Sequence, residues 1–203
     1  MRRLAIAISL CLTSPAAAED DAPTLSGMTP VADDAVLCAA LRAGWTSTAS
    51  SCTRKTSSTM REIGALEVWQ ASSPDTQRWV LVLGSGAQRW MSPPVEVPTG
   101  EGCGAGHCSE NEVAPALRVI HPHGRPAAVL DLTIARRTVA NESPRQVLHA
   151  SREELFIACG TDAHGARSCT PPLGADGACA VRLRDDGAIV QTCQSIQRLS
   201  PYR

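Results

Sequence analysis

Aromatic side chains are scarce in this 203-residue chain, in which four Trp, one Tyr and one Phe make up 3% of the sequence. Aromatic residues bury the largest area per side chain. A core built mainly from Val, Leu and Ile therefore benefits from covalent support. Nine cysteines are present to supply it.

An excess of charge of one sign is also lacking, since the formal net charge is −1. This excludes the basic footprint of a nucleic-acid-binding protein and the polybasic anchor of a peripheral membrane protein. We therefore expect no nucleic-acid partner. The basic residues are almost all arginine, with Lys55 as the single lysine. Together with abundant alanine, this is typical of GC-rich bacterial genomes.

Motifs of common enzymes are absent. Gly84-Ser85-Gly86 lacks the Gly-x-Ser-x-Gly spacing of a nucleophile elbow and is better explained as a hairpin turn. There is no Walker loop, His-Glu-x-x-His pair or dinucleotide fingerprint. The sequence therefore assigns no catalytic residue and predicts no cofactor.

The first 18 residues are organised as a secretory signal peptide. Arg2 and Arg3 form a basic region, residues 4–12 form an apolar region, and three alanines at 16–18 form a cleavage site. The apolar region is too short to span a bilayer, which takes about 20 residues. We predict cleavage after Ala18 and a mature chain without a transmembrane segment. Its net charge is −3 once the two arginines are removed. The expected location is the periplasm or the extracellular space.

A lipoprotein is the alternative, in which Cys11 becomes the lipidated first residue. Leu10 opposes it, because a small residue is needed before a lipidated cysteine.

Removing Cys11 with the signal peptide leaves an even number of cysteines, which in an exported chain indicates disulfides. The remaining cysteines are Cys38, Cys52, Cys103, Cys108, Cys159, Cys169, Cys179 and Cys193. Eight cysteines allow 105 pairings, so the spacing must decide among them.

Two pairings follow from counting outward from hairpin turns. If residues 185–187 form a three-residue loop with Gly187 in the left-handed position, Leu183 lies opposite Ile189 and Cys179 opposite Cys193. Both cysteines then occupy a non-hydrogen-bonded pair, where side chains are closest.

The same count around residues 163–165 places Cys159 opposite Cys169, which predicts a second disulfide. The other two predicted disulfides, Cys38–Cys52 and Cys103–Cys108, follow by elimination and proximity. In the chain-entropy model, each bridge of this loop size stabilises the fold by about 2–3 kcal/mol.

Residues 63–97 contain apolar runs separated by Pro, Asp, Gly and Ser, and hold three of the four tryptophans. This pattern is typical of an antiparallel meander. Upstream, Asp33 as N-cap and Gly44 as the residue after the C-terminus delimit a helix over residues 34–43.

The remaining pattern predicts further strands and polar loops. Strands are expected at residues 114–121, 127–135, 147–149 and 154–158, and loops at 46–59, 99–109 and 136–144. The fold class is mainly β: an antiparallel meander, forming a sandwich or an open barrel, with one short N-terminal helix and disulfide staples. We expect one domain over residues 33–203, preceded by a flexible lead-in at 19–32.

Four side chains are candidates for a hydrolase that lacks a known motif: His121, His123, Asp131 and Asp162. A triad can be drawn from Ser85, His121 and Asp131. In an enzyme these groups would converge in one concave pocket. Without convergence they are polar residues at hairpin turns, where such residues are expected.

Metal binding is the third hypothesis. Cys103 and Cys108 are five residues apart, and His107 directly precedes Cys108. This histidine could complete a zinc site with the two thiolates. His107, His121 and His123 could alternatively share a metal ion. Export opposes the first arrangement, because oxidation competes with thiolate ligation.

Residues 154–160, Glu-Leu-Phe-Ile-Ala-Cys-Gly, followed by residues 168–173, Ser-Cys-Thr-Pro-Pro-Leu, resemble a segment of uncharacterised exported proteins of GC-rich Gram-negative bacteria. The resemblance implies a signal peptide, a β-rich body and a C-terminal strand pair. Those proteins carry no assigned activity, so it transfers no site residue.

The hypothesis favoured over the hydrolase and the metal-binding protein is a non-enzymatic binding or interaction module of the cell envelope. Its partner would be an unknown envelope protein or a small ligand. The loops expected at 99–109 and 136–144 are of the kind that carry recognition.

Overall fold

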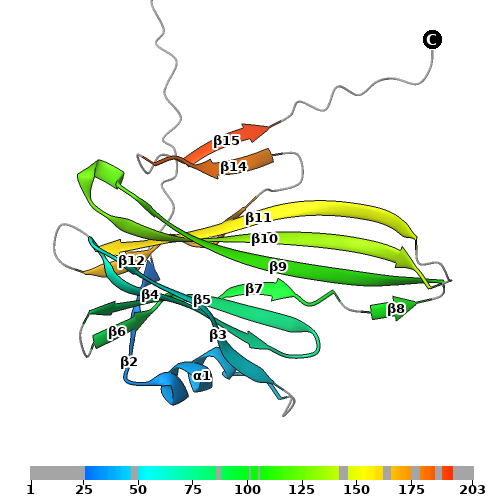
Figure 1. Cartoon of the computed structure of the whole chain (residues 1–203), viewed down its shortest axis with the longest axis horizontal. Helices are drawn as coiled ribbons and strands as arrows, with labels where there is room; N and C mark the ends of the chain where they lie inside the picture. Colours follow the sequence, from blue (N-terminus) through cyan, green and yellow to red (C-terminus); the bar gives the residue numbers. More distant parts are fainter. Residues whose placement is uncertain are drawn as a thin grey trace, which may run out of the picture.

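Two antiparallel β-sheets face each other across a shared core in the computed structural model, and the larger sheet is curled (Figure 1). The structure describes residues 26–46, 50–85, 88–100, 102–104, 106–141, 146–161, 166–174, 179–185 and 189–193. The predicted signal peptide, its cleavage site and Cys11 lie outside the described residues.

The smaller sheet is the meander predicted for residues 63–97, with one strand added on each side. Its order is β2 (Thr29–Val31), β6 (Gln88–Met91), β5 (Thr76–Ser85), β4 (Gly64–Ser72) and β3 (Ser51–Met60), and β7 (Val95–Pro98) also pairs with β5. The turn between β4 and β5 is closed by Ser73, whose hydroxyl accepts a hydrogen bond from the Thr76 amide at 3.1 Å. The prediction of the meander is confirmed.

The larger sheet is built around three long strands. Its order is β1 (Ser26–Gly27), β12 (Arg167–Cys169), β11 (Val147–Thr161), β10 (Ala127–Ala140), β9 (His107–Ile120) and β8 (Gly102–Gly104), with β13 (Leu173–Gly174) paired to β11. A separate hairpin consists of β14 (Cys179–Leu183) and β15 (Ile189–Cys193).

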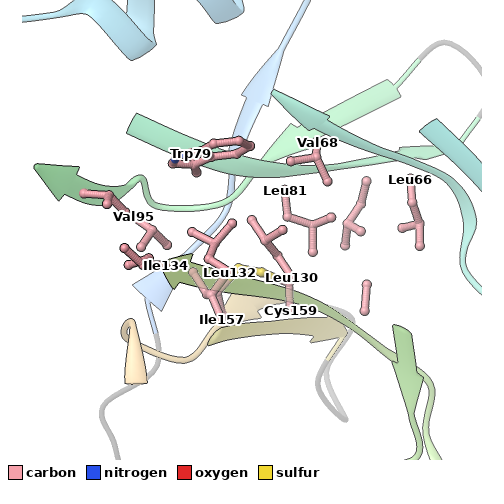
Figure 2. Packing of buried hydrophobic residues seen from close by; sticks show 14 residues of the cluster. Leu66, Val68, Trp79, Leu81, Val95, Leu130, Leu132, Ile134, Ile157 and Cys159 are labelled. Carbon is pink, nitrogen blue, oxygen red and sulfur yellow. A yellow bond between two sulfur atoms is a disulfide. The ribbon is translucent and has the colours of Figure 1, made fainter. Parts of the chain in front are cut away.

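Alternation along the strands directs the apolar side chains of both sheets into one core. Leu130, Leu132 and Ile134 of β10 face Leu66, Val68 and Leu81 of the smaller sheet (Figure 2). Trp79 is 2% exposed in this cluster, and the disulfide-forming Cys159 and Cys169 are fully buried in it. The predicted period-two alternation of residues 127–135 is thereby confirmed.

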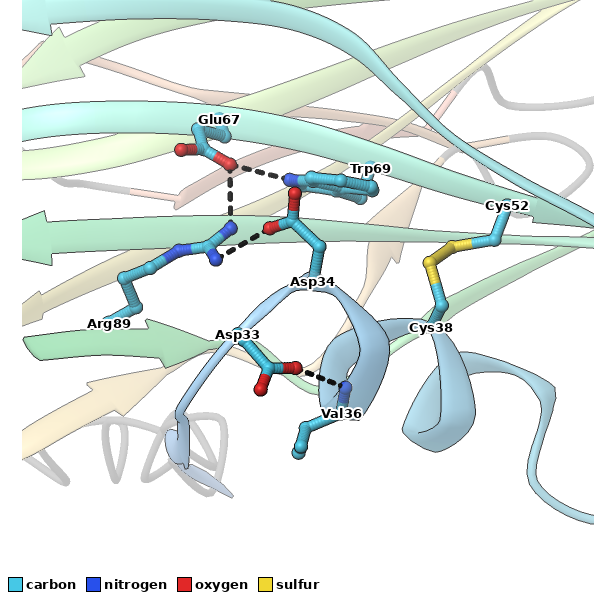
Figure 3. The surroundings of a disulfide bond; sticks show 8 residues. All are labelled: Asp33, Asp34, Val36, Cys38, Cys52, Glu67, Trp69 and Arg89. Atoms are coloured by element: carbon cyan, nitrogen blue, oxygen red, sulfur yellow. Dashed lines mark hydrogen bonds and ion pairs between the residues drawn. A yellow bond between two sulfur atoms is a disulfide. The ribbon is translucent and has the colours of Figure 1, made fainter.

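The helix α1 (Asp34–Arg42) covers the other face of the smaller sheet, where Leu37 and Leu41 pack with Trp69 and Val80. Asp33 caps its N-terminus as predicted, with the carboxylate accepting a hydrogen bond from the Val36 amide at 2.8 Å (Figure 3). The predicted helix at residues 34–43 is thus confirmed to within one residue.

Both ends of α1 are tied to the sheet by arginines. At the N-terminus, Arg89 donates to Asp34 at 2.7 Å and to Glu67 at 2.8 Å (Figure 3). Burial lowers the pKa of Arg89, but its hydrogen bonds and charge interactions with these two carboxylates outweigh that effect and raise the pKa above its ordinary value. At the C-terminus, Arg78 donates to the carbonyls of Leu41 and Ala43, satisfying helix-end acceptors.

Three of the four predicted disulfides are present: Cys38–Cys52, Cys103–Cys108 and Cys159–Cys169. In the last two, the cysteines are directly opposed on neighbouring strands and their Cα atoms are 4.0 Å apart, as suits a non-hydrogen-bonded pair.

The fourth predicted bridge lies in the β14–β15 hairpin. The backbone places Cys179 opposite Cys193 and Leu183 opposite Ile189, so the predicted register is confirmed. The side chains of both cysteines lie outside the described residues, and this disulfide stays a prediction.

The predicted loops were wrong in three places. Residues 51–59 of the Ser/Thr-rich loop expected at 46–59 belong to the edge strand β3. Most of its side chains are exposed, and pairing of its backbone with β4 holds it as a strand. Within residues 99–109, β8 and the start of β9 form a hairpin. Within 136–144, β10 continues to Ala140.

Two further differences concern strand length and the lead-in. The separate strands predicted at 147–149 and 154–158 are one continuous strand, β11, because the polar residues between them pair along β10. Residues 26–31 of the expected flexible lead-in form β1 and β2, which pair with β12 and β6. Residues 19–25 lie outside the described part of the chain.

Candidate functional site

A cavity of about 330 Å³ lies where one end of the larger sheet meets the turn between β3 and β4. We call it the end pocket. It is lined by Glu62, Ile63, Leu83, Arg125, Pro126, Cys159, Gly160, Thr161 and Arg167. In Figure 1 the β3–β4 turn and the β9–β10 connection lie at the same end of the sheets.

Local turn chemistry positions the walls of the end pocket. Ile63 donates its amide to the carbonyl of Met60 at 3.2 Å, which closes the β3–β4 turn. The β9–β10 connection contains the short 3₁₀-helix η1 (Pro122–Gly124), and the amide of Arg125 donates to the Pro122 carbonyl at 3.0 Å. Gly124 has φ of +75°, a conformation that favours glycine. These hydrogen bonds fix the backbone positions from which the side chains of Glu62, Ile63, Arg125 and Pro126 extend.

Arg167 is held by a stacking contact with the smaller sheet. Its guanidinium carbon lies 3.6 Å from the centre of the Trp90 ring on β6. Its carbonyl accepts a hydrogen bond from the Met28 amide at 3.1 Å. Stacking uses the flat face of the guanidinium and leaves its N–H groups, which lie in the plane, able to bind an acceptor.

The charges around the end pocket are unbalanced. Among the residues that the structure describes, neither Arg125 nor Arg167 has a carboxylate within ion-pair distance. The carboxylate in the lining, Glu62, lies 2.5 Å from Nε2 of His121. The end pocket therefore combines two arginines with one carboxylate that already has a partner.

Of the four hydrolase candidates, only His121 and Asp131 have described side chains, and these two do not meet. Asp131 accepts a hydrogen bond from Nε of Arg118 at 2.7 Å on the outer face of the larger sheet, whereas His121 contacts Glu62 at the end pocket. The side chains of Ser85 and His123, and Asp162 as a whole, lie outside the described residues. The contact between His121 and Asp131 that the triad with Ser85 requires is not formed, because each of the two side chains binds another partner.

Asp131 has a structural partner instead. Arg118 also donates to the carbonyl of Leu183 at 3.3 Å and lies 3.7 Å from the carboxylate of Asp185. The amide of His121 donates to the Asp185 carbonyl at 2.9 Å. Below these contacts, Leu183 packs against buried residues of the same face, including Phe156. The polar cluster therefore attaches the β14–β15 hairpin to the larger sheet.

The two proposed metal sites are also not formed. Cys103 and Cys108 are joined in a disulfide, so neither sulfur is a thiolate ligand. His107 begins β9 and His121 follows its end, and a strand of 14 residues extends roughly 45 Å at about 3.3 Å per residue. They cannot share one ion. In the described ranges, no three His, Cys, Asp or Glu side chains are grouped suitably for a metal.

The opposite ends of the long strands form an exposed arm. Figure 1 shows β8 and the adjoining ends of β9, β10 and β11 reaching beyond the smaller sheet. Val147 and Leu148, near its tip, are each 59% exposed. The arm also carries the Cys103–Cys108 bridge. It holds parts of the two segments in which recognition loops were expected, and residues 102–104, 107–109 and 136–140 of these segments are paired strands.

Sequence reasoning missed both arginines of the end pocket. The hairpin count that pairs Cys159 with Cys169 also places Arg167 opposite Thr161, so its position on the strand could have been found. Its stacking on Trp90 could not, because the two residues are 77 positions apart and on different sheets.

Two general findings bear on where the protein works. The disulfides indicate a non-reducing compartment. Of the helices in the described ranges, none has the length and apolar character needed to cross a membrane. No protein-family model matches the chain, and it is significantly similar to no curated protein and no solved structure.

Proposed function

We propose that this chain is an exported, non-enzymatic binding module that acts in the periplasm or outside the cell and holds a small ligand in the end pocket. The observation that carries the proposal is the end pocket itself. Its walls come from turns and strand ends of both sheets, and it contains two arginines without a carboxylate partner among the described residues. A preformed cavity with a few converging polar groups is the usual form of a small-ligand site.

Export is supported by two independent features. The first 18 residues carry the basic, apolar and small-residue regions of a signal peptide. The disulfides between strands and between helix and sheet persist only where thiols are not kept reduced. The resemblance to exported proteins of Gram-negative bacteria agrees with this proposal.

A hydrolase is the second candidate, and one contact favours it. His121 lies 2.5 Å from Glu62 at the edge of the end pocket, and a carboxylate that orients a histidine is a common arrangement for general-base catalysis. This version of the hypothesis uses Glu62 in place of Asp131. It lacks a nucleophile among the described side chains, so a water molecule would have to be activated directly.

Binding and turnover can be separated in one experiment. The exported protein is incubated with the small-molecule fraction of a bacterial envelope extract, and its thermal unfolding is recorded. A ligand at 100 times its Kd stabilises the native state by about 2.7 kcal/mol, so a raised Tm identifies binding. The bound compound is then released by denaturation and identified by mass spectrometry.

Recovery of a compound already present in the untreated extract supports a binding module. Recovery of a new product that requires the native protein would refute the non-enzymatic proposal. His121→Gln is then the informative variant, because it leaves the arginines in place and should abolish turnover only. An unchanged Tm with every fraction would contradict the small-ligand function.

A further inference from the structure

We propose that the end pocket binds the carboxylate or phosphate group of a small ligand between Arg125 and Arg167, an inference that rests on the proposed binding function. The two groups share the chemistry that matters here, namely oxygens carrying negative charge. The rest of the ligand would lie against the apolar part of the lining.

The first argument is that Arg167 is preorganised as an anion ligand. Its guanidinium lies 3.6 Å from the centre of the Trp90 ring, which restricts its rotation without using its N–H donors. Arginine presents these donors as a planar fork that matches the oxygens of a carboxylate or phosphate. Much of the side-chain ordering that binding requires is therefore already present.

The second argument is the missing counter-charge. Arg125 and Arg167 line the same cavity, and no carboxylate of the described chain lies within ion-pair distance of either. By contrast, Arg78, Arg89 and Arg118 each have one at 2.7 Å. Two arginines at one pocket therefore create a positive potential, which an anionic group would neutralise.

The third argument is the size and polarity of the cavity. At about 330 Å³ it is near the lower limit for small-molecule sites, so the ligand is small. Ile63, Leu83 and Pro126 are apolar residues of the lining, and Thr161 is a neutral polar one. A compact organic acid or phosphate monoester fits this combination better than a bare ion or a polymer.

The binding test uses two probes, inorganic phosphate and sodium benzoate, each titrated at constant ionic strength into the full exported protein. Binding is followed by isothermal titration calorimetry and by tryptophan fluorescence. We expect saturable binding of at least one probe. Saturation by phosphate alone assigns the phosphate class, and saturation by benzoate alone assigns the carboxylate class.

Variants then locate the bound probe. Arg167→Gln and Arg125→Gln should each weaken binding about tenfold or more, because each removes charge-assisted hydrogen bonds. Arg137→Gln is the matched control, since it removes the same charge from the arm at the other end of β10. Its affinity should equal that of the parent protein.

A further pair of variants tests Trp90 as a positioning residue. Trp90→Leu removes the ring under Arg167 and should weaken binding severalfold with every charge retained. Trp90→Phe retains an aromatic face and should restore most of the affinity. Urea unfolding of each variant shows whether the fold is intact, and Arg125→Gln changes an exposed side chain that is not needed for folding.

Absence of saturable binding by both probes would overturn the inference, and so would an equal loss of affinity in Arg137→Gln. Failure of this anion-binding inference can be distinguished from failure of the proposed binding function. If an extract compound stabilises the parent and Arg167→Gln equally, the protein binds a ligand by other chemistry and only this inference is wrong. If the probes bind but extract compounds are converted, the site is correct and the non-enzymatic function is wrong.

Discussion

Replacing both Cys159 and Cys169 by Ala should cost much of the stability of this fold. Their disulfide closes a loop with a sequence separation of 10, which corresponds to about 2.7 kcal/mol in the chain-entropy model. Both residues are also fully buried in the core between the sheets, so removing two sulfur atoms adds on the order of 1 kcal/mol for the space left behind. The expected loss is about 3–4 kcal/mol, against a typical total of about 5–15 kcal/mol.

The matched control is the double variant of Cys103 and Cys108 to Ala. That bridge has a sequence separation of 5, and halving the loop reduces the entropic gain by about 0.6 kcal/mol. Cys103 is exposed, and Cys108 is 5% exposed but does not belong to the core cluster between the sheets. Loss of this bridge should therefore cost about 2 kcal/mol.

Urea unfolding monitored by tryptophan fluorescence measures both losses, provided that free energies extrapolated to water are compared. Midpoints alone would mislead, since removing a cross-link also changes the unfolded state and hence the slope. If the control variant loses as much free energy as the core variant, the placement of Cys159–Cys169 in the shared core is refuted.

Three further perturbations test separate parts of the structure. Asp33→Ala removes the cap of α1 and should lower the free energy of unfolding by about 1 kcal/mol, measured by urea denaturation; Asp33→Asn should recover most of it, and no loss would contradict the cap. Arg118→Gln should speed amide hydrogen exchange in β14, because Arg118 bonds both Asp131 and the carbonyl of Leu183. Hydrogen exchange mass spectrometry measures this, and unchanged exchange would mean that the hairpin does not depend on this arginine. Lys55→Val should increase aggregation measured by light scattering, because the charge lies at a register irregularity of the edge strand β3; Lys55→Arg is the control, and equal scattering of the Val and Arg variants would refute the role.

Both long edges of the sheets carry features that discourage strand addition. In the described residues, β3 pairs only with β4, and its ladder is interrupted between Arg54 and Thr56, where Lys55 lies. On the larger sheet, β9 continues beyond its short pairing with β8 as an edge strand and contains Pro115, which has no amide hydrogen to donate. Edges of this kind oppose the addition of another strand.

Local patterns in the sequence determined several elements before any tertiary contact was considered. The helix at Asp34–Arg42 follows from a cap and an apolar face that lie within one short segment. The opposition of Cys159 with Cys169 and of Cys179 with Cys193 follows from counting across turns, because strand pairing beside a tight turn leaves few registers. These features depend on residues within about fifteen positions of one another.

Tertiary structure decided what depends on distant partners. The strand β3 and the polar parts of β10 and β11 have no apolar alternation, and become strands because a neighbouring backbone satisfies their hydrogen bonds. The end pocket is lined by residues of both sheets, and Arg167 in its lining contacts the Trp90 ring of the opposite sheet. Asp131 accepts a hydrogen bond from Arg118, whereas His121 contacts Glu62. A sequence shows which side chains are present. Which of them contact each other depends on how distant segments pack, and the spacing along the chain does not reveal this packing.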